Sequence, residues 1–113
     1  MADCLFCSII AGQIPAEIIA RTQSSLAFKD IDPKAPVHFL VVPLEHSENL
    51  TQMSAQAAGQ LISDATQAAK DLGLDPAEQG FRLVLNSGAG AGQTVFHTHV
   101  HVLGGRDFLW PPG

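Results

Sequence analysis

The sequence predicts an α+β domain in which an antiparallel sheet of about five strands is covered by a short N-terminal helix and one long helix. Two observations predict this class. Short apolar segments of strand length recur at uneven spacing between turn residues, and residues 54–72 carry apolar side chains at helical spacing. Because the 113 residues contain no internal repeat and no linker, we predict a single domain over residues 1–113.

Each element has its own local signal. The predicted strands are residues 17–21, 26–30, 38–42, 81–85 and 97–103. A short helix is predicted at residues 7–11, because Gly12 ends it and Pro15 follows. The long helix of residues 54–72 begins at a Ser that can cap its first turn, and a Gly follows it. A glycine-rich loop, residues 87–93, precedes the last strand, and an irregular tail follows that strand.

Composition limits the possible partners. The net charge of −5 argues against nucleic acid, whose phosphate backbone requires clustered Lys and Arg, but backbone N–H groups can still hold a small nucleotide. The longest apolar run, residues 39–42, is far shorter than the roughly 20 residues of a membrane span, so no membrane partner is predicted. The N-terminus has no basic region followed by an apolar stretch, which predicts a cytoplasmic protein with reduced thiols.

Three of the five histidines, His97, His99 and His101, lie within five residues. On a strand, residues two apart point to the same face and lie roughly 6.6–7 Å apart, so the three imidazoles would line one face. Surface histidines are the alternative, but a row of imidazoles has poor β propensity and no packing advantage. A neutral imidazole can attack phosphorus without a separate base, and its neighbours can hold phosphate oxygens. The row therefore predicts phosphoryl chemistry.

The glycine-rich loop lies directly before the histidines. Glycines at alternate positions from Gly88 to Gly92 allow positive φ angles and bring backbone N–H groups close to a ligand. The tract matches neither the P-loop nor the dinucleotide fingerprint. In isolation it could equally be a flexible surface loop. Beside the histidines it predicts a phosphate cradle.

The two cysteines, Cys4 and Cys7, have the spacing of half a zinc site, and two histidines distant in the sequence would complete it. A thioredoxin-type redox pair is a second interpretation, but it needs a strand before the motif, where the sequence offers almost nothing. Two buried apolar cysteines without a chemical role are a third. The sequence favours zinc and leaves the other two interpretations open.

The segment His97-Thr-His-Val-His101-Val-Leu resembles the signature of the histidine-triad (HIT) superfamily, a histidine followed by an apolar residue three times over. Thr98 departs from the apolar pattern, although a β-branched residue suits a strand. Further segments resemble the Hint branch of this superfamily: Cys-Leu-Phe-Cys at 4–7, Leu-Ala-Phe-x-Asp-Ile at 26–31, Ala-Pro-x-His-Phe-Leu-Val at 35–41 and the closing Gly-Gly-Arg…Trp-Pro-Pro-Gly. The resemblance covers nearly the whole chain.

The resemblance implies a HIT-like fold and a homodimer that binds purine nucleotides such as AMP or GMP, without an organic cofactor. It also implies hydrolysis of nucleoside phosphoramidates, such as adenosine 5′-monophosphoramidate or AMP joined to a lysine amine. The middle histidine, His99, would attack the α-phosphorus and become transiently adenylated, His101 would contact the phosphate, and His38 would support the nucleophile. The other positions that match nucleotide contacts are Leu5, Phe6, Asp30, Ile31, Asn86, Gly92, Gln93 and Thr94. Of these, Asp30 matches the ribose position, whereas Leu5, Phe6 and Ile31 match an apolar base pocket and could equally be core residues.

Two further features follow from the resemblance. Bacterial members with Cys-x-x-Cys bind a structural zinc through four closed ligands, which here are Cys4, Cys7, His46 and His97. Other Hint members lack these cysteines, so the zinc is not expected to take part in the chemistry. The C-terminal tail, residues 110–113, is expected to reach the partner's active site, where Trp110 would contact substrate.

Two other functions compete with this hydrolase. The first is a nucleotide-binding regulatory or interaction module whose histidine triad is vestigial, although all three triad histidines are present. The second is a metalloenzyme that uses the histidines as ligands. Such a site usually recruits a carboxylate further along the chain, and only Asp107, in the tail, follows the histidines.

Overall fold

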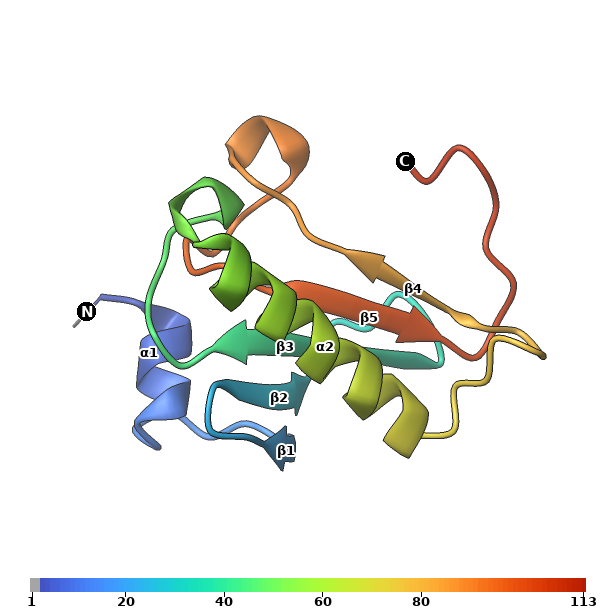
Figure 1. The fold of residues 1–113 in the computed structure, drawn as a ribbon, viewed down its shortest axis with the longest axis horizontal. Coiled ribbons are helices and arrows are strands. Elements are labelled where there is room, and N and C mark those ends of the chain that lie inside the picture. Colours follow the sequence, from blue (N-terminus) through green and yellow to red (C-terminus); the bar gives the residue numbers. More distant parts are fainter. Residues whose placement is uncertain (1–2) are drawn as a thin grey trace.

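The computed structural model describes residues 3–113; Met1 and Ala2, part of the N-terminal segment used for the localisation prediction, lie outside the described residues. Five antiparallel strands form one sheet in the order β1-β2-β3-β5-β4, which leaves β1 and β4 at its edges (Figure 1). The strands are β1 (Ile18–Arg21), β2 (Ser25–Lys29), β3 (Val37–Pro43), β4 (Phe81–Val84) and β5 (Val100–Gly104). The helices are α1 (Leu5–Ile10) and α2 (Ala55–Asp71), with short 3₁₀ turns η1 (Leu50–Gln52) and η2 (Ala89–Ala91). The predicted α+β class, with one short and one long helix on an antiparallel sheet, is confirmed.

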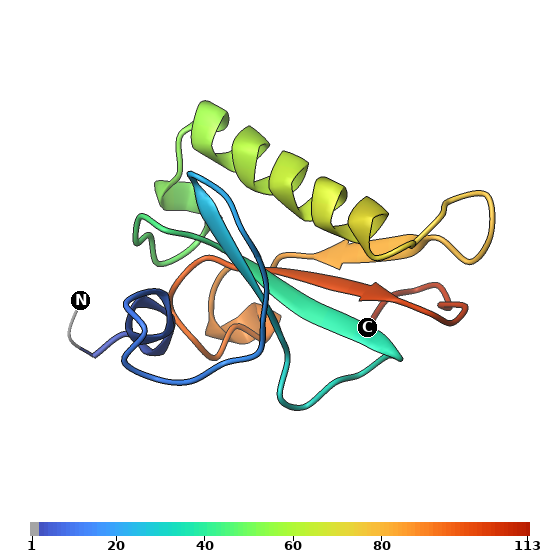
Figure 2. The ribbon, with the colours of Figure 1, turned by 90° about the horizontal axis from the view of Figure 1, so that it is seen from below.

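Helix α2 covers one face of the sheet (Figure 2). It begins where the Ser54 hydroxyl accepts a hydrogen bond from the backbone N–H of Ala57, which satisfies a donor that the first helical turn leaves free. Its apolar stripe packs on alternate residues of the central strands. The buried residues of this layer are Ala27, Phe39, Val41, Leu61, Ala65, Ala68, Ala69, Leu74, Val100 and Val102. Within residues 3–113, neither α2 nor any other helix is long and apolar enough to cross a membrane.

The opposite face of the sheet carries α1, His38 and His101. Alternation along β2 and β3 turns a second apolar set toward this face, and Phe6 of α1 packs against it. Its buried members are Phe6, Leu26, Phe28, Leu40 and Val42. His38 has the same parity as Leu40 and Val42 along β3, and His101 pairs with Leu40 in the β3–β5 ladder. Both histidines therefore lie on the face that α2 does not cover.

Two predicted boundaries were wrong. The last strand begins at Val100 and not at residue 97, because the Thr98 N–H bonds to the Ser47 carbonyl outside the sheet, and the ladder with β3 starts at the Val41–Val100 pair. The short helix begins at Leu5 and not at Cys7, because the Cys4 side chain accepts a hydrogen bond from the Cys7 N–H and caps the helix there.

Candidate active site and metal centre

His38 and His101 form a hydrogen-bonded pair across strands β3 and β5. The His38 Nε2 and His101 Nδ1 atoms lie 2.9 Å apart, and the Asp30 carboxylate lies 3.4 Å from the same Nε2 atom. The backbone N–H of Lys34 donates to His38 Nδ1 over 3.0 Å. Assigned from these partners, the neutral His38 ring carries its proton on Nε2 and donates it to His101 Nδ1. His101 then carries its own proton on Nε2, where it can donate to a ligand.

His99 has the opposite arrangement of donor and acceptor. Its Nδ1 atom lies 2.7 Å from the backbone carbonyl of His97, which can only accept, so Nδ1 carries the proton. The Nε2 atom of His99 therefore keeps its lone pair. The ring is 6% exposed and packs edge-on against Phe6, with the ring centres 5.0 Å apart. Main chain and aromatic packing thus fix both the tautomer and the orientation of this imidazole.

Burial keeps these imidazoles neutral. It lowers the pKa of His99, and the hydrogen bond to the His97 carbonyl only partly opposes the shift. Burial, together with the neighbouring His99 and His38, lowers the pKa of His101 to about 4. Burial also lowers the pKa values of His38 and His97, although the Asp30 carboxylate acts against the shift at His38. A neutral ring is the form that has a lone pair for attack.

Four side chains come together beside the N-terminal end of α1. The sulfur and Nδ1 atoms of Cys4, Cys7, His46 and His97 all lie within 4.8 Å of one another. The two Nδ1 atoms are 3.1 Å apart, and the sulfurs of Cys4 and Cys7 lie 3.3 Å and 3.5 Å from His97 Nδ1. The Cys7 sulfur also lies 3.5 Å from His46 Nδ1. The four residues expected to be ligands are therefore brought together.

The donor set fits zinc. Nitrogen and sulfur ligands at about 2.0–2.3 Å from a central ion lie about 3.3–3.8 Å apart at the corners of a tetrahedron, close to the separations found here. The Nε2 atom of His97 lies 2.8 Å from the Pro43 carbonyl and donates to it, so the Nδ1 lone pair points at the sulfurs. His97 thus belongs to the metal cluster, while its own carbonyl holds His99.

Asp30, His38 and His101 form a second group with metal-ligating atoms close together. Two histidines and a carboxylate can hold iron or a similar ion. Here, however, the Lys34 N–H occupies His38 Nδ1 and leaves the proton on Nε2, so the atom that faces the group has no lone pair to offer. This group fits a hydrogen-bond relay and does not fit a metal.

The relay opens onto a cavity of about 280 Å³. Asp30, His38, Asn86 and His101 line it together with Lys34, which brings residues from four segments of the chain to one wall. Three of the predicted nucleotide contacts and His38 therefore share one cavity.

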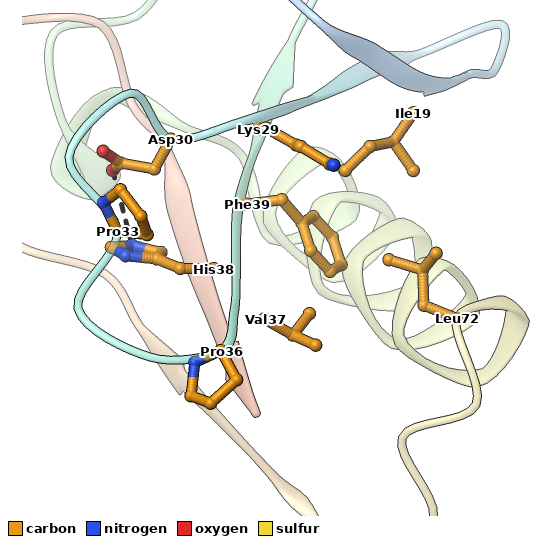
Figure 3. Close-up of a pocket in the computed structure, with 9 residues that line it drawn as sticks. All are labelled: Ile19, Lys29, Asp30, Pro33, Pro36, Val37, His38, Phe39 and Leu72. Atoms are coloured by element: carbon orange, nitrogen blue, oxygen red, sulfur yellow. Dashed lines mark ion pairs between the residues drawn. The ribbon is translucent and has the colours of Figure 1, made fainter. Parts of the chain in front are cut away.

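A second cavity of about 400 Å³ adjoins Asp30 and His38 where β2 ends (Figure 3). Figure 3 shows Asp30 and His38 on one side of β3 and Phe39 with Leu72 on the other.

The glycine-rich loop holds itself together. The N–H groups of Gly92 and Gln93 donate to carbonyls within the loop, at Ala89 and Gly88. The buried Gln93 amide donates to the carbonyls of Glu48 and Val95 and accepts from the Gly88 N–H. The N–H groups of Gly92 and Gln93 and the Gln93 amide thus shape the loop, and the expectation that these two residues hold phosphate stays a prediction.

The remaining nucleotide-contact residues differ in exposure. Phe6 is buried between the sheet and His99, whereas Leu5 is 44% exposed and Ile31 is fully exposed. Thr94 lines a separate cavity of about 410 Å³ beside Cys4 and Leu5. Trp110 is 83% exposed in the C-terminal tail. Within residues 3–113, only Phe6 of this group has the surroundings of a core residue.

Sequence reasoning missed the main-chain groups that orient the imidazoles. The Lys34 N–H, the Pro43 carbonyl and the His97 carbonyl each fix one ring. Backbone groups leave no residue-type signal, so only the folded chain could reveal them. The side-chain hydrogen bond of His38 goes to His101, and the expected support of His99 by His38 stays a prediction.

Residues 11–108 match the HIT domain family, and the chain therefore belongs to this family. An uncharacterized HIT-like protein of Synechocystis sp. is 47% identical over 117 residues, which cover 98% of this chain and 97% of the relative. A similar HIT-like protein of Synechococcus elongatus is 42% identical over 114 residues, covering 98% and 97%.

Solved structures share the fold over nearly the whole chain. A HIT family hydrolase from Legionella pneumophila superposes with a TM-score of 0.91 at 40% identity, covering 98% of this chain and 100% of that one. A histidine triad nucleotide-binding protein from Candida albicans superposes with a TM-score of 0.81 at 31% identity, covering 88% and 73%. The predicted HIT-like fold is thus confirmed.

Proposed function

We propose that this protein hydrolyses purine nucleoside phosphoramidates through a transient nucleotidyl-histidine on His99. One observation carries the proposal: the His97 carbonyl holds the proton of His99 on Nδ1 and leaves the Nε2 lone pair on a neutral, rigidly packed imidazole. A nucleophile of this kind needs no separate base. Two similar structures, those of a HIT family hydrolase and of a histidine triad nucleotide-binding protein, support the same class of activity.

The reaction proceeds in two displacements. His99 Nε2 attacks the α-phosphorus, the new N–P bond forms as the P–N bond of the substrate breaks, and the departing amine takes up a proton from solvent. Water then attacks the phosphorus of the nucleotidyl-histidine, returns the electron pair to Nε2, releases a proton and yields the nucleoside monophosphate. His101 donates its Nε2–H to a phosphate oxygen, which stabilises the charge that grows on that oxygen in both displacements.

The residues around the relay bind the rest of the nucleotide. Asp30 accepts from the ribose hydroxyl groups, and Asn86 in the same cavity donates to the phosphate. Thr94 adds a hydroxyl donor, while Gly92 and Gln93 act by shaping the loop. The exposed side chains of Leu5 and Ile31, together with the buried Phe6, contact the purine base.

Zinc is proposed as a structural ion held by Cys4, Cys7, His46 and His97. With four protein ligands the ion would have no open position for substrate. Its role would be structural, because it would join α1 to the segment that presents His99. No step of the reaction passes through it.

We further propose a homodimer whose C-terminal tails reach across to the partner's site. The 83% exposure of both Leu109 and Trp110 supports this assembly, because two neighbouring large apolar side chains are seldom left in water without a partner surface. Sedimentation of the full chain tests it, and a monomer at micromolar concentration would contradict it.

The activity is tested by incubating the protein with AMP-morpholidate and measuring release of AMP. We expect steady turnover that His99→Ala abolishes while the folded variant still binds AMP. Tight AMP binding without turnover by the unaltered protein would favour the nucleotide-binding module instead.

A further inference from the structure

Thr98 is a polar residue at a position where the family pattern is apolar, and it is fully buried between His97 and His99. A buried hydroxyl group without a hydrogen-bonding partner destabilises the fold. Thr98 therefore requires a hydrogen-bonding partner on a neighbouring segment, and the identity of that segment determines what the hydroxyl group can position.

Ser47 is that partner, and it contacts Thr98 in three ways. The two side-chain oxygens lie 2.7 Å apart, the Thr98 hydroxyl donates to the Ser47 carbonyl over 3.2 Å, and the Thr98 N–H donates to the same carbonyl over 2.8 Å. The arrangement is reciprocal, with the Ser47 hydroxyl donating to Thr98 and the Thr98 hydroxyl donating back to the Ser47 main chain. The Ser47 hydroxyl group thus has Thr98 as its acceptor, whereas the Thr98 hydroxyl group also has an acceptor in the Ser47 main chain.

The contact joins two irregular segments that the sheet does not hold. The β3–β5 ladder ends at the Val41–Val100 pair, so residues 44–49 and 95–99 both lie beyond it. Ser47 directly follows His46, and Thr98 directly follows His97. Holding Ser47 to Thr98 therefore fixes the separation of the two histidines in the metal cluster, whose Nδ1 atoms are 3.1 Å apart.

The same contact fixes the segment that presents the nucleophile. The peptide between His97 and Thr98 supplies the carbonyl that accepts from His99 Nδ1 over 2.7 Å. A rotation of this peptide would remove the acceptor and free the His99 ring to change its tautomer or its orientation. Residues 95–99 belong to no strand or helix, so this peptide is held by local contacts: the Thr98 N–H donates to the Ser47 carbonyl, and the His97 ring donates to the Pro43 carbonyl.

We propose that Ser47 and Thr98 form a positioning clamp that sets both the geometry of the metal ligands and the tautomer of His99. The part of this inference that concerns kcat rests on the proposed function. The parts that concern the geometry of the metal ligands and the tautomer of His99 do not. The pair acts through His46, His97 and His99 and does not itself touch substrate.

The experiment compares Thr98→Val, Ser47→Ala, the double variant and Thr98→Ser in the full chain. Zinc affinity is measured by competition with a chromogenic chelator, and the His99 tautomer by imidazole ¹⁵N NMR. The kcat and KM values are measured with AMP-morpholidate.

Thr98→Val and Ser47→Ala should each weaken zinc binding about tenfold and lower kcat about tenfold, with little change in KM. A loss of about tenfold lies in the range for residues that orient metal ligands. Thr98→Ser keeps the hydroxyl group and should retain zinc affinity and activity.

The double variant separates positioning from simple packing. Because the Ser47 hydroxyl group acts through the Thr98 hydroxyl group, removing both should reduce zinc affinity and kcat no further than Thr98→Val alone does. Ser25→Ala is the matched control, since it removes another buried hydroxyl group, bonded to Asp64 over 2.6 Å, between β2 and α2. It should lower stability and leave zinc affinity and kcat at the values of the unaltered protein.

Three results would overturn the clamp. The first is unchanged zinc affinity and kcat in both single variants, and the second is a loss of only one of the two quantities. The third is a double variant whose losses equal the product of the single losses. If Thr98→Val does not fold, Ser47→Ala and Thr98→Ser still decide the question. If the unaltered protein has no hydrolase activity, the proposed function fails, while zinc affinity and the His99 tautomer still test the clamp.

Discussion

His38 Nε2 lies 2.9 Å from His101 Nδ1, and this contact makes the tautomer of one ring dependent on the other. The dependence begins in the main chain, because the Lys34 N–H occupies His38 Nδ1. A backbone group in the loop after β2 thus determines which nitrogen of His101 faces the cavity with a proton.

Removing His38 should release the tautomer of His101. In His38→Ala the Nδ1 atom of His101 loses its donor, so its proton can move to Nδ1 and the Nε2–H that faces phosphate is lost in part of the molecules. We expect kcat to fall about 10²-fold, at the lower end of the range for losing one hydrogen-bond donor to a charge that grows in the transition state. Imidazole ¹⁵N NMR should show mixed tautomers of His101, and a single unchanged Nε2–H tautomer would contradict the relay.

Acid should weaken the fold through His101. Its pKa is lowered to about 4 in the folded protein, below the ordinary value of 6.5, so between these values the unfolded chain binds more protons than the folded chain. Stability is therefore complete above about pH 6.5 and is lost as the pH falls toward 4, by up to about 3 kcal/mol from this one group. The lowered pKa of His38 acts in the same direction.

Urea unfolding measured across this pH range tests the sign and the size of the effect. His101→Gln should flatten the dependence, because a Gln side chain does not titrate. A fold whose stability rises on acidification, or whose pH dependence is the same in His101→Gln, would contradict this assignment.

Removing zinc should affect stability more than chemistry. Chelation, or Cys7→Ser, separates α1 from the segment that carries His97 and should lower the Tm clearly, because structural zinc contributes directly to folding. The kcat value of the remaining folded protein should fall much less, since no step uses the metal. Loss of kcat upon chelation without a change in Tm would instead indicate a catalytic metal.

Replacing Asp64 on α2 should lower the free energy of unfolding and leave kcat unchanged. Burial raises the pKa of this carboxyl group, but hydrogen bonds from Ser25, Gln60, Ser24 and Thr22 outweigh burial and hold the pKa below its usual range. Asp64→Ala removes a charged acceptor and leaves these donors without it, so we expect a loss of about 1–3 kcal/mol in urea unfolding.

Asp71 provides the matched control for this change. It lies on the same helix but has a single exposed hydrogen bond, from Gln67, so Asp71→Ala should change stability by less than about 0.5 kcal/mol. Equal losses in the two variants would contradict the role given to Asp64, and neither variant should change kcat.

The sequence predicted most of the elements because their signals are local. The apolar stripe of α2 and its Ser54 cap depend only on residue type and spacing. The same is true of the alternation that separates Val100 and Val102 from His101. The start of the last strand could not be predicted, because it depends on Ser47, a residue about fifty positions away that pairs with Thr98.

The candidate site divides in the same way. The resemblance to the HIT family pointed to the cysteines and histidines that the fold brings together as possible metal ligands. The split of roles among the imidazoles depends on carbonyl and N–H groups, which every residue carries and no sequence pattern marks. Nothing in the sequence indicated that the Gln93 amide bonds to the main chain of its own loop and of the loop beside it, because those main-chain groups carry no residue-type signal.

The central claim is that His99 Nε2 forms a covalent bond to the α-phosphorus of the substrate. Mass spectrometry of protein quenched in acetone during turnover of AMP-morpholidate tests it most directly. The account predicts an adduct with the mass of an adenylyl group on the peptide that contains His99, absent in His99→Ala and decaying once substrate is exhausted. Steady release of AMP with no adduct on that peptide, or with an adduct on another residue, would contradict it.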